Sequence, residues 1–143
     1  MKLTPIALFI VLTGILLLSV IIGHFLPPTG ILIIPIVISI ITSIIVFTDN
    51  GFNVLVKSLL CYFFIGLNDI GIKLFAGGRH DMEGIGWIHM LLFIGLVPCL
   101  IMLVIGVFRD AKVATWLKFL SVSTFVLFVY LHLELFETLG VIV

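Results

Sequence analysis

The residues that could do chemistry in this sequence are histidines and carboxylates set in a largely apolar chain. The histidines are His24, His80, His89 and His132. The acids considered with them are Asp69, Asp81, Glu83, Glu134 and Glu137. Side chains of these types can bind a divalent metal or carry protons and ions, and either chemistry requires several of them to meet.

A metal site is the first hypothesis, because imidazole nitrogen and carboxylate oxygen suit zinc or a similar ion. Its candidate ligands are His24, His80, His89, His132, Asp81 and Glu83. The spacing of these residues is not specific, since side chains two apart on a helix point away from each other. The sequence therefore permits a zinc-like divalent metal at the outer face but does not require any cofactor.

A proton or ion path is the second hypothesis, with Asp69, Lys73, Glu134 and Glu137 as its candidate residues. Asp69 and Lys73 are four apart with the acid first, which is the favoured order for a helical ion pair. Tyr130, Glu134 and Glu137 share one helix face by their spacing of four and three. Acids inside a membrane usually belong to such a path.

Composition places the chain in a membrane. Hydrophobic residues make up 63% of the 143 residues and charged residues 10%, and the mean hydropathy is +1.49. A soluble domain carries about a quarter charged residues. This length allows about four to six spans of roughly 20 residues. Seven basic and seven acidic residues balance, which argues against a nucleic-acid partner.

The apolar runs predict an all-α membrane protein, a compact bundle of about five transmembrane helices in a single domain over residues 1–143. The predicted spans cover residues 4–26, 31–47, 52–75, 85–108 and 113–139. Short connections predict that consecutive helices are antiparallel neighbours. Residues 27–30, Pro-Pro-Thr-Gly, predict a tight turn, and residues 79–83 a charged connection.

Two prolines qualify this layout. Pro35 falls early in the second span, so an alternative is that residues 31–47 re-enter the membrane, which would leave four spans. Pro98 lies well inside the fourth span, where a missing backbone donor predicts a kink near Ile94. Such a kink would be a weak point for movement.

The basic residues predict orientation, because they collect on the cytoplasmic side. With the N-terminus inside and the C-terminus outside, the inner ends hold Lys2, Lys57, Arg109, Lys112 and Lys118, and the outer ends hold Lys73 and Arg79. All four histidines then fall at the outer face. A solvated rim is the alternative interpretation of this cluster, since polar residues cost least at span ends.

No family is recognised in the sequence, which carries no nucleotide-binding, zinc-protease or hydrolase motif. The favoured interpretation is a small integral membrane protein that is a transport component or membrane subunit of a larger complex. Its expected partners are lipid and further copies or other membrane subunits, in a bacterial cytoplasmic membrane. The alternatives are a metal-dependent membrane enzyme, acting on a lipid-like or periplasmic substrate, and a scaffold without catalysis.

Overall fold

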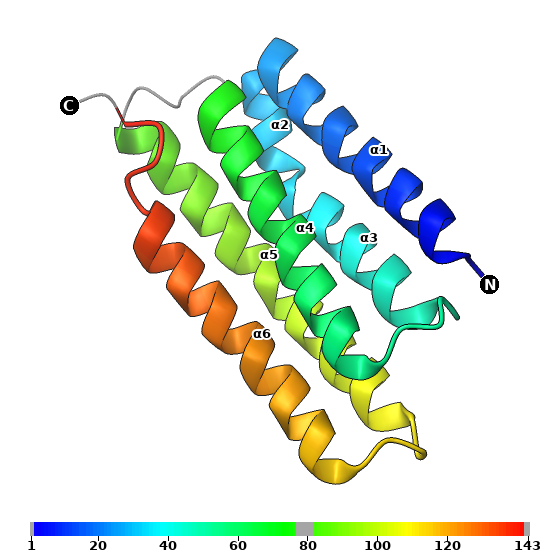
Figure 1. Ribbon diagram of the computed structural model, residues 1–143. Helices are drawn as coiled ribbons and strands as arrows, with labels where there is room; N and C mark the ends of the chain where they lie inside the picture. Colours follow the sequence, from blue (N-terminus) through cyan, green and yellow to red (C-terminus); the bar gives the residue numbers. More distant parts are fainter. Residues whose placement is uncertain (1, 77–81, 142–143) are drawn as a thin grey trace.

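The computed structural model describes residues 2–76 and 82–141 as a bundle of helices that run along a common direction (Figure 1). The helices are α1 (Pro5–Phe25), α2 (Pro27–Leu32), α3 (Ile34–Phe47), α4 (Val54–Phe75), α5 (Met82–Arg109) and α6 (Thr115–Phe136). The predicted all-helical class is confirmed. Four helices, α1, α4, α5 and α6, are long and apolar enough to cross a membrane.

Local sequence explains where the long helices begin. The Thr4 hydroxyl accepts a hydrogen bond from the Ala7 amide at 3.3 Å, and Pro5 occupies the first turn of α1, where no amide donor is needed. The Asn53 side chain accepts from the Val56 amide at 2.9 Å and starts α4. These helices therefore begin close to the predicted positions.

The predicted tight turn at residues 27–30 is wrong, because these residues form most of α2. Pro27 is the first helical residue, where its missing amide hydrogen costs nothing. The second predicted span, residues 31–47, consequently covers only the end of α2 and the whole of α3, which meet at Ile33. With 14 residues, α3 is about 21 Å long, shorter than the roughly 30 Å hydrocarbon core of a bilayer. The five-span count is therefore not confirmed.

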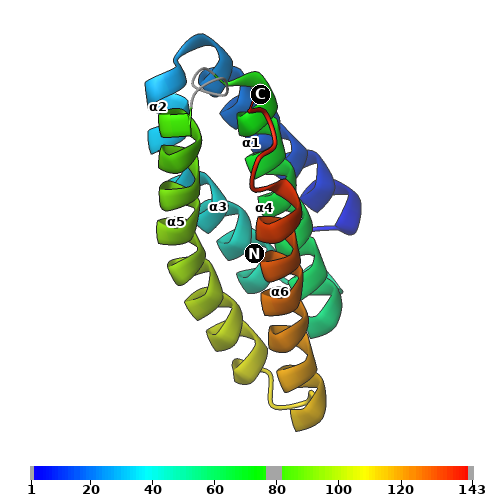
Figure 2. The ribbon, with the colours of Figure 1, turned by 90° about the vertical axis from the view of Figure 1, so that its left-hand side faces the viewer.

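The charged connection also ends earlier than predicted. Glu83 lies in the first turn of α5, where an acid interacts favourably with the helix dipole. From there α5 continues without a break through Pro98, and its two halves are inclined to each other (Figure 2). Arg79, His80 and Asp81 lie outside the described residues.

Packing is closest between parallel helices rather than between consecutive ones. The most extensive contacts join α3 to α5 and α4 to α6, although consecutive helices also touch. Glycine explains the α3–α5 pair: a methyl group placed on Gly95 would lie 2.5 Å from Ile38 Cδ1 and 2.7 Å from Pro35 Cα. In a membrane, small residues of this kind let helix backbones approach closely.

Glycines at the polar end of α4 have the same effect. A methyl group on Gly71 would lie 2.6 Å from Val20 of α1, and one on Gly66 would lie 3.3 Å from the His132 ring of α6. Helix α4 thus lies in contact with α1, α3, α5 and α6. Gly66 is the position that lets an imidazole ring approach the α4 backbone.

Two ends of the bundle differ in charge. One end, here called the basic end, is where α3 and α5 finish and α4 and α6 begin. There the Leu3 amide donates to the Asp49 carbonyl at 3.0 Å, and Lys57 Nζ donates to the Thr48 carbonyl at 3.1 Å. The opposite end, here called the histidine end, is where α1, α4 and α6 finish and α5 begins (Figure 1). The candidate residues of the described chain lie toward the histidine end.

Candidate functional site

Three buried side chains meet between α4 and α6. Asp69 Oδ2 lies 2.7 Å from Lys73 Nζ and 2.9 Å from His132 Nε2. Asp69 is 1% exposed, Lys73 is fully buried and the His132 side chain is 5% exposed. We refer to Asp69, Lys73 and His132 as the buried triad. An ionised carboxylate can only accept, so both nitrogens donate to Oδ2.

The ends of α4 and α6 position these groups. Lys73 follows Asp69 by one helical turn, which brings the ammonium over the carboxylate. Lys73 Nζ also donates to the Phe136 carbonyl at 2.9 Å, at the C-terminal end of α6, where a helix favours positive charge. The ammonium therefore joins the two helices through a side-chain and a backbone acceptor.

The triad lies well inside the bundle. Asp69 precedes the end of α4 by six residues, or about 9 Å of helix. Removing two charges from water costs several kcal/mol for each ion, and the mutual attraction offsets this cost only with good geometry. Apolar residues would fill the same space without that cost. The presence of two buried charges at this position therefore requires either a structural or a functional reason.

Not every polar atom near the triad is satisfied. Asp69 Oδ1 and both amide atoms of Asn68 are buried and have no hydrogen-bond partner among residues 2–76 and 82–141. Buried polar groups in proteins are nearly always hydrogen-bonded. Beside the paired Oδ2 there is thus a second carboxylate oxygen able to accept a proton or a hydrogen bond. This property suits a group that changes its bonding during a working cycle.

His89 of α5 lies near the triad without bonding to it. It interacts electrostatically with Lys73, Asp69, His132 and Glu137, and its Nε2 is buried without a hydrogen-bond partner. His89 and Glu137 line a groove between α5 and α6 that also includes Tyr130 and Glu134. The predicted shared face of Tyr130, Glu134 and Glu137 on α6 is consistent with this lining.

The remaining metal candidates do not join this cluster. His24 Nδ1 donates to the Phe75 carbonyl at 3.0 Å and is exposed, and Glu83 is exposed at the start of α5. Within the described ranges, no three His, Cys, Asp or Glu side chains are grouped as metal ligands would be. His80 and Asp81 lie outside those ranges, so the metal hypothesis stays a prediction.

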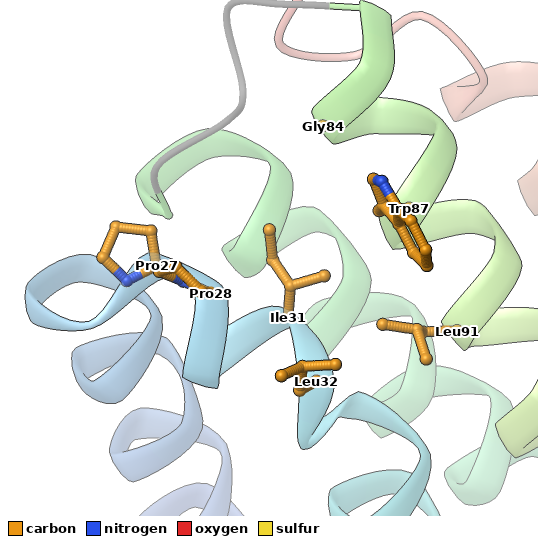
Figure 3. A pocket seen from close by; sticks show the side chains of 7 residues that line it. All are labelled: Pro27, Pro28, Ile31, Leu32, Gly84, Trp87 and Leu91. Carbon is orange, nitrogen blue, oxygen red and sulfur yellow. The ribbon is translucent and has the colours of Figure 1, made fainter.

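A separate groove near the histidine end is almost entirely hydrocarbon. Its volume is about 370 Å³, and its walls come from α2 and the first turns of α5. Ile31 and Leu32 face Trp87 and Leu91 across it (Figure 3). The described lining of this groove supplies no acid, base or metal ligand, so it offers apolar contact alone.

Sequence reasoning assigned Asp69 and His132 to different hypotheses, one to an ion path and the other to a metal. The structure joins them through one hydrogen bond. Gly66, one turn before Asp69, leaves the room for this ring from another helix. Asn68 was missed as a buried residue.

Comparison of the chain with protein families, with curated proteins and with solved structures gave no match.

Proposed function

We propose that this protein is a small membrane transport component that carries protons, or another small cation, through the buried triad of Asp69, Lys73 and His132. The observation that supports the proposal is the fully buried Asp69–Lys73 pair bonded to His132 within apolar helices. Ionisable residues inside a membrane are costly, and those that persist mark ion pathways and proton relays.

The unpaired oxygen of Asp69 supports a role in transfer rather than a static link. Oδ2 is held by two donors, whereas Oδ1 is buried without a partner. The imidazole of His132, which is hydrogen-bonded to Oδ2, is a group that can accept or release a proton. A proton arriving at Asp69 would weaken its attraction for Lys73, which allows the α4–α6 contact to change during transport.

We further propose that α2 and α3 together make a fifth crossing. Their combined path matches that of α1: Gly30 lies beside Gly23 near the end of α1, and Asp49 bonds Leu3 near its start. The basic end would face the cytoplasm of a bacterial cell, with the histidine end outside. Association with lipid, with further copies or with other membrane subunits stays a prediction.

Proton flux into liposomes tests the proposal. The variant Asp69→Asn/Lys73→Met removes both charges together, so it leaves no unpaired buried ion. In liposomes with a pH-sensitive dye and a potassium-driven membrane potential, we expect its flux to be at least tenfold below that of the wild type. Glu83→Gln, which removes an exposed acid at the same end, should retain wild-type flux.

Two outcomes would contradict this function. One is a wild-type flux equal to that of protein-free liposomes. The other is full flux through the doubly substituted protein, which is what a purely structural link between α4 and α6 predicts. Circular dichroism and monodispersity of each variant before reconstitution ensure that folded proteins are compared.

A further inference from the structure

The groove between α5 and α6 carries features of a ligand site beside the triad. Its volume is about 360 Å³, within the range typical of small-molecule sites. We call it the acidic groove, and its lining is His89, Phe93, Tyr130, Leu133, Glu134 and Glu137. No lysine or arginine lines it.

Two carboxylates give the acidic groove its charge. Glu134 and Glu137 are both exposed, and neither forms an ion pair within the part of the chain that the structure describes. The nearby Lys73 ammonium is already bonded to Asp69. Among the described residues the groove therefore carries negative charge that no ion pair offsets, and such charge attracts cations and repels anions.

Polarity changes with depth along the groove. Glu137 directly follows α6, and Glu134 lies about 3 Å before the helix end. Tyr130 lies about 9 Å before that end, and Phe93 about 16 Å beyond the start of α5. One end of the groove is thus anionic and the other aromatic.

The aromatic walls are accessible to a ligand. Phe93 is 54% exposed and Tyr130 is 58% exposed, so both rings offer apolar contact and an electron-rich face. Aromatic faces attract cations by about 0.5–2 kcal/mol, the larger values applying where water is excluded. His89 adds a buried Nε2 without a hydrogen-bond partner on the α5 side.

We propose that the acidic groove binds a lipophilic organic cation, an amine or quaternary ammonium with an apolar body. Its charge would lie between Glu134 and Glu137, and its body between Phe93 and Tyr130. A small inorganic cation would leave the aromatic walls unused, and a neutral lipid would leave the carboxylates without a partner.

This proposal rests on the proposed function and names its substrate class. His89 interacts electrostatically with Glu137 in the groove and with Asp69, Lys73 and His132 of the triad. A cation bound at Glu137 would therefore change the electrostatic potential at His89, which the triad charges also influence. Binding of the organic cation and protonation of Asp69 would then be linked, as exchange of one for the other requires.

Direct binding of tetraphenylphosphonium to the full-length protein in lipid nanodiscs tests the site. Equilibrium dialysis, with empty nanodiscs subtracted, should give saturable binding to the wild type. The variant Glu134→Gln/Glu137→Gln should bind at least tenfold more weakly, because both charges are lost and the shape is kept. Glu83→Gln should bind as the wild type does, and neutral triphenylphosphine oxide should not compete.

Equal affinity of the wild type and the Glu134→Gln/Glu137→Gln variant, or equal competition by the neutral probe, would overturn the proposal. The binding measurement needs no flux, so the two proposals fail separately. Proton flux without tetraphenylphosphonium binding removes the substrate assignment and keeps the triad's function. Carboxylate-dependent binding without proton flux supports the groove as a cation site and overturns the proposed proton path.

Discussion

Replacing Asp69 with asparagine is expected to lower the free energy of unfolding by about 3–5 kcal/mol, the range seen when one member of a buried ion pair is removed. Lys73 would keep its ammonium in a fully buried position, with the Phe136 carbonyl as its acceptor. Phe125 is the one buried hydrophobic residue of α6 in the described chain. The C-terminal half of α6 therefore depends strongly on the triad.

A second substitution should restore this loss. Asp69→Asn/Lys73→Met contains no unpaired charge, and the asparagine oxygen can still accept from His132, so most of the lost stability should return. Asp110→Asn is the control, because Asp110 lies exposed in a connection and its side-chain oxygen accepts from the Lys112 amide. Unfolding in mixed detergent, followed by circular dichroism, measures each difference. An unchanged Asp69→Asn protein would show that the pair is not buried.

Gly95→Ala is expected to destabilise the protein by about 2 kcal/mol. The added methyl group would meet the backbone Cα of Pro35 at 2.7 Å as well as the Ile38 side chain, so α3 and α5 must move apart. Overpacking of a tight core costs about 1–3 kcal/mol, and a rigid backbone neighbour places this site at the upper end. The better helix propensity of alanine offsets about 1 kcal/mol.

Gly86→Ala is the matched control within the same helix. Apart from the backbone of α5 and the two chain neighbours, no described atom lies within 4 Å of a methyl group at Gly86, so only the gain in helix propensity, up to about 1 kcal/mol, should remain. Detergent unfolding should therefore separate the two alanine variants by about 3 kcal/mol. Similar stabilities would mean that α3 and α5 are not in close contact at Gly95.

Most of the helices could be predicted from the sequence, because a long uninterrupted apolar segment in a membrane forms a helix. Four predicted spans correspond to α1, α4, α5 and α6. The residues Pro27 and Pro28 misled the prediction, since the same dipeptide that ends one helix can occupy the first turn of the next. The choice between these roles depends on contacts such as that of Gly30 with Gly23.

The site was less predictable, because helix pairing is not encoded by run length. Connection lengths favoured consecutive helices as the main contacts, whereas glycines made the parallel pairs α3–α5 and α4–α6 the closest. The Asp69–Lys73 spacing predicted their ion pair correctly. The third member, His132, is 63 residues from Asp69 and could be placed only once α6 was known to pack on Gly66.

The proposed path through the buried triad depends most directly on the hydrogen bond between His132 and Asp69 in a lipid bilayer. Solid-state nitrogen NMR of histidine-labelled protein in membranes measures it, with His24 as an internal reference because His24 bonds the Phe75 carbonyl instead. We predict that Asp69→Asn/Lys73→Met shifts the Nε2 signal of His132 and leaves the His24 signals in place. A His132 signal identical in the two proteins would contradict the buried triad and the path proposed through it.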